Sequence, residues 1–170
     1  MFRKMRRIGQ LLDEEKAIGI LENGSFGTLA LSGDDGYPYA LPISYVLSGR
    51  SIFFHSALSG HKIDSIKRNP KCSFSVVGKD DVFPEAFTTR YESVIAFGRI
   101  SIVEDDEEKM RAIRLIGEKY CSSVPFPIRE DEIEKSWNAL LILKMKIEHL
   151  TGKKALEGTL ASGKDPQVLQ

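Results

Sequence analysis

The sequence predicts a mainly β protein (α+β), a small closed or split barrel of six antiparallel strands with flanking helices. Strand-like segments follow one another across tight turns, and helical spacing appears before, between and after them without a helix after every strand. A parallel α/β sheet would need a crossover helix after nearly every strand, and this order does not provide one. The 170 residues suffice for one well-packed domain, expected over residues 1–155 with a flexible tail over residues 156–170.

The composition argues against several classes of protein. The hydrophobic fraction of 42% and charged fraction of 28% are ordinary for a globular domain, and a formal net charge of zero argues against nucleic-acid binding. No run approaches the roughly 20 apolar residues that span a bilayer. Cys72 and Cys121 lack metal-ligand spacing and favour free thiols of a reducing compartment. We therefore expect a cytoplasmic protein with no nucleic-acid or membrane partner.

The first third of the chain predicts a capped helix and a three-stranded meander. Asp13 can cap a helix over residues 13–22. Strand-like alternation then covers residues 25–31, 37–46 and 51–56. The Asp-Asp-Gly at residues 34–36 is a strong hairpin signal. Pro38 and Pro42 each remove a ladder donor, so the second strand is expected at an edge, at a bulge or against a ligand.

The remainder alternates helices with longer strands. Helices are expected over residues 60–68, from Asp105 onward and over residues 130–137, the last after a linker at residues 125–127. Strands are expected over residues 71–77, 90–103 and 139–148, and a loop over residues 79–89. Gly98 interrupts the long strand, where a bend or bulge would help to close a barrel.

The segment from His55 to Lys62 is the best candidate for a binding site. A strand ends at His55 and Ser56, and Ser59 with Gly60 opens a helix whose free amide groups and dipole attract an anion. Lys62 adds a positive charge, so the segment can hold one phosphate group. The simpler alternative is that Ser59 only caps the helix and Lys62 only points to water. The glycine pattern of a P-loop or dinucleotide fold is absent.

Other chemistries find little support in the sequence. The three histidines have no metal-ligand spacing, so no metal site is expected. A nucleophile elbow is missing. The paired acids, among them Asp34 and Asp35, suit turns and caps better than acid–base catalysis. Trp137 could stack on a flat ring, but packing is the more ordinary role of a single tryptophan beside a strand.

Several motifs together resemble the pyridoxamine 5′-phosphate oxidase-related FMN-binding proteins. They are residues 36–45 (GYPYALPISY), 52–57 (IFFHSA), 60–64 (GHKID) and 68–70 (RNP). Residues 87–95 (FTTRYESVI), 97–99 (FGR) and 147–153 (IEHLTGK) are similar to the branch related to 5-nitroimidazole resistance proteins. The resemblance covers roughly residues 5–154 and implies an FMN-binding split β-barrel homodimer with the flavin between its subunits.

The resemblance also implies roles for individual residues. Pro42, Ile43 and Ser44 would pass along the isoalloxazine ring, and Arg90 and Ser93 are weaker candidates for cofactor contacts from the partner subunit. The residues at the ribityl and phosphate end would be His55, Ser56, Ala57, His61 and Lys62. FAD in place of FMN stays open, since its adenosine half would lie beyond the phosphate.

For function, the resemblance favours an FMN-dependent oxidoreductase, related to nitroreductases, that acts on small electrophilic or aromatic substrates. The arginine-rich substrate pattern of true pyridoxamine phosphate oxidases is missing, which makes vitamin B6 synthesis doubtful. No catalytic residue is assigned. Two alternatives remain: a non-enzymatic protein that stores or senses FMN, or binds haem through His55 or His149, and a structural dimer with a vestigial pocket.

Overall fold

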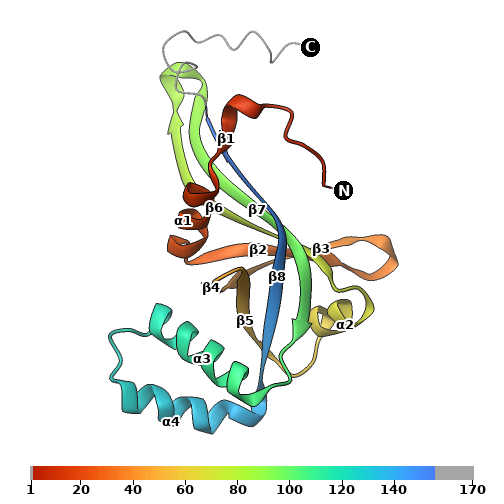
Figure 1. Cartoon of the computed structure of the whole chain (residues 1–170), viewed down its shortest axis with the longest axis vertical. Helices are drawn as coiled ribbons and strands as arrows, with labels where there is room; N and C mark the ends of the chain where they lie inside the picture. Colours follow the sequence, from red (N-terminus) through yellow and green to blue (C-terminus); the bar gives the residue numbers. More distant parts are fainter. Residues whose placement is uncertain (1, 156–170) are drawn as a thin grey trace.

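A single antiparallel sheet of eight strands forms the body of the molecule (Figure 1). The computed structural model describes residues 2–155, and the tail expected over residues 156–170 lies outside them. The sheet order is β3-β2-β6-β7-β8-β5-β4, and β1 pairs with β8. The strands are β1 (Leu11–Leu12), β2 (Phe26–Ser32), β3 (Pro38–Ser44), β4 (Val46–Ser48), β5 (Ser51–Ala57), β6 (Lys71–Phe83), β7 (Thr88–Ile102) and β8 (Leu140–Lys154).

The sheet curves into a split barrel because β8 changes neighbours along its length. Its first half pairs with β5 up to Lys146, and its second half pairs with β1 at Gly152 and Lys153. The edge of β8 is therefore open between these two ladders, where the barrel splits. The mainly antiparallel split barrel expected from the sequence is confirmed, with β1 and β4 as two short strands that were not predicted.

Three of the four helices pack against the sheet, and the last one in the chain lies on the third, away from the sheet (Figure 1). The helices are α1 (Glu14–Asn23), α2 (His61–Arg68), α3 (Asp106–Tyr120) and α4 (Phe126–Ser136). The carboxylates of Asp13 and Asp105 accept hydrogen bonds from the amide groups of Lys16 and Glu108, so both are helix caps. Among the described residues, no helix is long and apolar enough to cross a membrane.

Two local predictions are wrong. The loop expected over residues 79–89 is instead the end of β6 and the start of β7, which form an arm that turns at Pro84–Ala86. Strands are predicted from alternating apolar and polar residues, which mark one buried face. Residues 79–82 are exposed and show no such alternation, so the strand was not recognised. The linker expected at residues 125–127 is the start of α4, because proline is tolerated in a first helical turn, whose amide groups have no partner in the helix.

The predicted turn, edge strand and bulge are all present. Asp35 and Gly36 have φ values of 51° and 81°, as a tight hairpin of this kind requires. The strand with two prolines, β3, stands at the end of the sheet order, where proline is tolerated because one side of the strand has no neighbour to receive a hydrogen bond. The register of β7 against β8 shifts between Phe97 and Gly98. The added residue lies on β8, where Glu148 falls between two ladder positions.

The main core fills the concave side of the sheet, and a second cluster lies beneath α3. The last turn of α3 also fixes the corner between β3 and β4. The Tyr120 hydroxyl accepts a hydrogen bond from the Tyr45 amide at 2.9 Å, and Lys119 donates to the Gly24 carbonyl at 2.7 Å. Tyr45, fully buried, donates from its hydroxyl to the Leu21 carbonyl at 2.6 Å. These contacts hold β3 in place beside the candidate site.

Candidate functional site

The segment from β5 to α2 has the strand–turn–helix form that the sequence predicts. His55 and Ala57 are exposed at the end of β5, whereas Ser56 is buried between them. The residue that precedes α2 is Gly60, with φ 120°, and no side chain caps the helix. The simpler reading of Ser59 as a helix cap is therefore wrong. The amide groups of Ile63 and Asp64 donate to the Gly60 carbonyl, so those of His61 and Lys62 are the donors of the first turn left for an anion in the described chain.

Lys62 stands on the buried side of α2 without a counter-ion. Ser65 and Ile66, three and four residues further along, are both buried, and side chains at these spacings share one face of a helix. The Lys62 side chain is half-buried, and it has no ion pair or hydrogen bond within residues 2–155. Burial lowers the pKa of its ammonium group because desolvation penalises the charged form. An anion beside Lys62 would favour the charged form and so offset this penalty.

His61 belongs to a separate cluster on the exposed side of α2. Successive helical residues are about 100° apart, so His61 and Lys62 point in different directions. The His61 ring stacks on Tyr39 of β3 with centroids 4.1 Å apart, and its Nε2 lies 3.4 Å from the Asp34 carboxylate. Arg68 also contacts Asp34, and its hydrogen bond is the main cause of the lowered pKa of that carboxyl. This cluster joins α2 to the β2–β3 hairpin.

The three residues predicted along the flavin ring divide between the two faces of the sheet. Ile43 packs against the main core, whereas Pro42 and Ser44 alternate with it and face outward. They lie opposite Thr28 and Phe26 of β2. Pro42 and Ser44 are thus available to a ligand on the outer side of the sheet, and Ile43 can contribute its backbone.

Arg90 and Ser93 lie on the arm, away from α2. Ser93 pairs with Val77, six residues along β6 from Lys71, which corresponds to roughly 20 Å along the strand. Arg90 stacks its guanidinium 3.8 Å from the Phe83 ring, and its Nε is buried without a hydrogen-bond partner in the described part of the chain. Neither residue joins Lys62 within one chain, although Ser93 faces outward like Pro42 and Ser44.

The outward-facing residues of five neighbouring strands form one broad surface, here named the outer sheet face. They alternate with residues of the main core, and their side chains are almost all small or apolar. They are Ala40, Pro42 and Ser44 of β3, Phe26, Thr28 and Ala30 of β2, Ser73, Ser75 and Val77 of β6, Ser93, Ile95 and Phe97 of β7, and His149, Thr151 and Lys153 of β8. Lys153 alone carries a formal charge.

The outer sheet face leaves large apolar side chains in contact with water. Phe26 and Val77 are 65% and 67% exposed, and Phe97 is 37% exposed although the Phe2 ring lies tilted beside it, with centroids 5.6 Å apart. The sequence interpretation missed most of this surface. The sequence does contain one sign of this surface. Residues 94–97 are apolar on both faces of the strand, and this pattern is typical of strands that are covered on both sides.

Two remaining side chains have structural roles. Trp137 lies beneath the ammonium group of Lys109, which is 4.1 Å from its ring centre and also donates to its carbonyl. Trp137 thus packs against Lys109. Cys72 and Cys121 are both free thiols, as predicted.

Comparison with known proteins points to one family. The family model for pyridoxamine 5′-phosphate oxidase matches residues 13–154. An uncharacterised protein of Rhizobium meliloti (strain 1021), RA0666, is 26% identical over 156 residues, which cover 89% of this chain and 98% of that protein.

Solved structures share the fold at low sequence identity. A candidate 5-nitroimidazole antibiotic resistance protein of Bacteroides thetaiotaomicron VPI-5482 is 20% identical, with a TM-score of 0.72 over 85% of this chain and 86% of that chain. The FAD and haem binding protein of Mycobacterium smegmatis is 21% identical, with a TM-score of 0.67 over 90% and 79% of the two chains.

Proposed function

Because this chain belongs to the pyridoxamine 5′-phosphate oxidase family, we propose that it is an FMN-binding oxidoreductase acting on small electrophilic or aromatic substrates. The observation that carries the proposal is Lys62, a half-buried cation on the inner side of α2 with no counter-ion in the described chain. A flavin phosphate provides that counter-ion. The uncapped first turn of α2 adds amide donors to the same anion.

The remaining candidate residues fit a flavin that extends from this phosphate site. The end of β5, with His55, Ser56 and Ala57, lies directly before the turn that leads to α2 and would border the ribityl chain. His61 would shape the site by holding α2 against Tyr39 and Asp34, since its own ring nitrogen is already engaged there.

The isoalloxazine ring would lie on the outer sheet face beside Pro42 and Ser44, with a second copy of the chain above it. A face of small and apolar residues across five strands is costly to expose and suits an isologous dimer. A partner subunit would bring its own Arg90 and Ser93 to the flavin, which one chain cannot do.

The flavin would supply hydride and electron transfer when bound, so the chain needs to supply only position and electrostatics. Pro42 has no amide hydrogen, which leaves the Ser44 hydroxyl and the free edge of β3 as donors toward the ring. The likeness to a candidate 5-nitroimidazole resistance protein supports nitroaromatic compounds as the substrate class. Vitamin B6 synthesis is not proposed, because the arginine-rich substrate pattern is missing.

The test is flavin affinity in a Lys62→Ala variant. Loss of a charge-assisted phosphate contact should cost about 1.5–3 kcal/mol of FMN affinity, roughly tenfold to over a hundredfold. Riboflavin has no phosphate and should bind both proteins equally. Lys67→Ala is the matched control, since Lys67 is on the exposed side of the same helix. The loss would be measured by fluorescence titration with FMN, FAD and riboflavin.

Three outcomes would contradict the proposal or narrow it. A wild-type protein that takes up no flavin rejects it. Equal losses for FMN and riboflavin would show that Lys62 acts through folding. A flavin that is bound but is not bleached by NADH or NADPH under anaerobic conditions would favour the non-enzymatic alternative, a protein that stores or senses FMN.

A further inference from the structure

Three basic side chains stand in a row across the middle of the sheet. Lys71 on β6 pairs directly with Arg99 on β7, and Arg99 pairs directly with Lys146 on β8. Residues directly opposite each other in antiparallel strands point to the same side, about 5 Å apart. All three side chains are exposed. We name these three residues the basic row.

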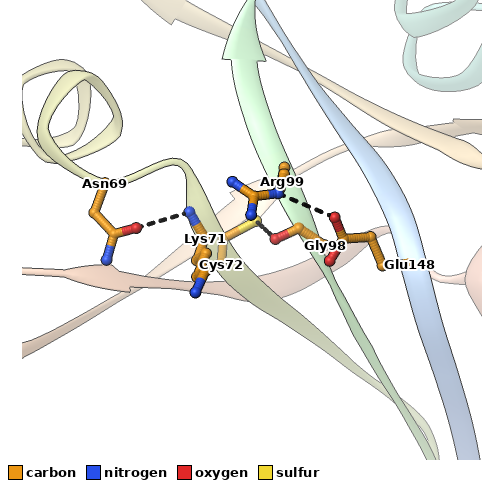
Figure 2. Close-up of polar contacts among 6 residues, drawn as sticks. All are labelled: Asn69, Lys71, Cys72, Gly98, Arg99 and Glu148. Carbon is orange, nitrogen blue, oxygen red and sulfur yellow. Dashed lines mark hydrogen bonds and ion pairs between the residues drawn. The ribbon is translucent and has the colours of Figure 1, made fainter. Parts of the chain in front are cut away.

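The basic row is only partly neutralised by nearby carboxylates. Like charges directly opposite each other destabilise a sheet, and here two such pairs are adjacent. Arg99 donates from Nε to Glu148 at 3.2 Å, which leaves its two terminal nitrogens without a partner among residues 2–155 (Figure 2). The ammonium groups of Lys71 and Lys146 have no ion pair in the same part of the chain. Glu148 is therefore the one carboxylate in the described chain that is paired with any of these three cations.

The basic row borders the outer sheet face. Along β7, Arg99 is two residues from Phe97, so the row lies roughly 7 Å beyond the apolar surface. From Lys71, the member of the row nearest to β3, Pro42 beside the proposed flavin ring is two strands across and four residues along, a separation of roughly 15–20 Å. A ligand that reacts at the ring and reaches the row must be extended, with anionic groups at its far end.

We infer that the basic row binds the phosphate groups of the electron donor, a nicotinamide dinucleotide. This inference rests on the proposed flavin site, because the ring fixes where the nicotinamide must lie. The two terminal nitrogens of Arg99 can donate a pair of parallel hydrogen bonds to a phosphate group. Lys71 and Lys146 add a positive charge on either side. Either the pyrophosphate or a 2′-phosphate can supply the anion.

Equilibrium binding of NADP⁺ and NAD⁺ to the FMN-loaded protein tests the inference without any electron transfer. The variant is Lys71→Gln with Lys146→Gln, which leaves the Arg99–Glu148 pair intact. The control, Lys16→Gln with Arg111→Gln, removes the same charge from exposed sites on α1 and α3. Calorimetric titration at one fixed ionic strength should show at least tenfold weaker NADP⁺ binding for the first variant and a change below twofold for the control.

Comparison of NADP⁺ with NAD⁺ shows which phosphate group of the dinucleotide binds the basic row. A loss for NADP⁺ alone assigns the row to the 2′-phosphate, and an equal loss for NAD⁺ assigns it to the pyrophosphate. Unchanged binding of both ligands to the Lys71→Gln, Lys146→Gln variant overturns the inference. The inference also fails if this variant binds both ligands normally and only self-associates more weakly in sedimentation. Flavin content is read separately from absorbance. A protein without flavin would refute the proposed function, while its titration with NADP⁺ would still report on the row.

Discussion

At the scale of single residues, Cys72 is a thiol held in its neutral form. It is 8% exposed, and its Sγ lies 3.6 Å from the Gly98 carbonyl oxygen (Figure 2). Burial raises the pKa of this thiol from 9.0 to about 12, and the negative charge of Glu148 acts in the same direction. Cys121 is exposed. The two thiols should therefore differ in reactivity and in their effect on stability.

Cys72 should make the protein lose stability at alkaline pH. In the unfolded chain the thiol ionises near its ordinary pKa, while in the folded chain it stays protonated up to about pH 12. Its contribution is thus complete below pH 9 and is lost as pH rises toward 12, at about 1.4 kcal/mol per pH unit. Urea unfolding from pH 8 to 10 should show a shallower decline for Cys72→Ala. Parallel declines in the two proteins would contradict this assignment, and Cys121→Ala is the control.

At the scale of elements, the bulge between β7 and β8 sets the course of the long strands. A Cβ built on Gly98 would lie 2.0 Å from the Lys146 carbonyl oxygen, an atom of the neighbouring backbone. Only glycine allows this approach. The sequence predicts a bend at Gly98, since a glycine in the middle of a strand has few other uses. It cannot predict that the additional residue is Glu148 on the neighbouring strand.

Gly98→Ala should destabilise the fold by about 1–3 kcal/mol, because the strands must move apart to admit one methyl group. Gly19 is the matched control. It lies within α1 and has open space around the position of a Cβ, so Gly19→Ala should stabilise the fold by about 0.5–1 kcal/mol through helix propensity. The measurement is the midpoint of urea unfolding for both variants. Equal shifts in the same direction would show that the bulge tolerates a side chain.

At the scale of the whole molecule, local patterns predicted more than long-range ones. Asp13, the Asp-Asp-Gly hairpin and the prolines of β3 each act within a few residues, and each behaves as predicted. The partners of His61, Asp34 and Tyr39, lie more than twenty residues from α2 in the sequence, so no local pattern predicts these contacts. The outer sheet face depends on the register of five strands, which alternation within one strand does not determine.

The outer sheet face gives a prediction for the assembly as a whole. If two copies pack through this face, a charge at its centre should prevent association without unfolding the subunit. Ile95 is 42% exposed in the single chain and lies between Ser75 and Thr151 on the neighbouring strands. Ile95→Asp should sediment as a monomer, because the new carboxylate would be buried without a partner in the dimer.

Phe126→Asp is the control for this experiment. Phe126 is 57% exposed but lies on α4, outside the outer sheet face, so its substitution should leave the dimer intact. Sedimentation velocity over a range of protein concentrations measures association, and FMN titration of the same samples measures cofactor affinity. Ile95→Asp should lose both properties together, since the partner would complete the flavin site. An Ile95→Asp protein that sediments as the wild type does would reject an interface at this face, and full FMN affinity in a monomer would mean that one chain suffices for the cofactor.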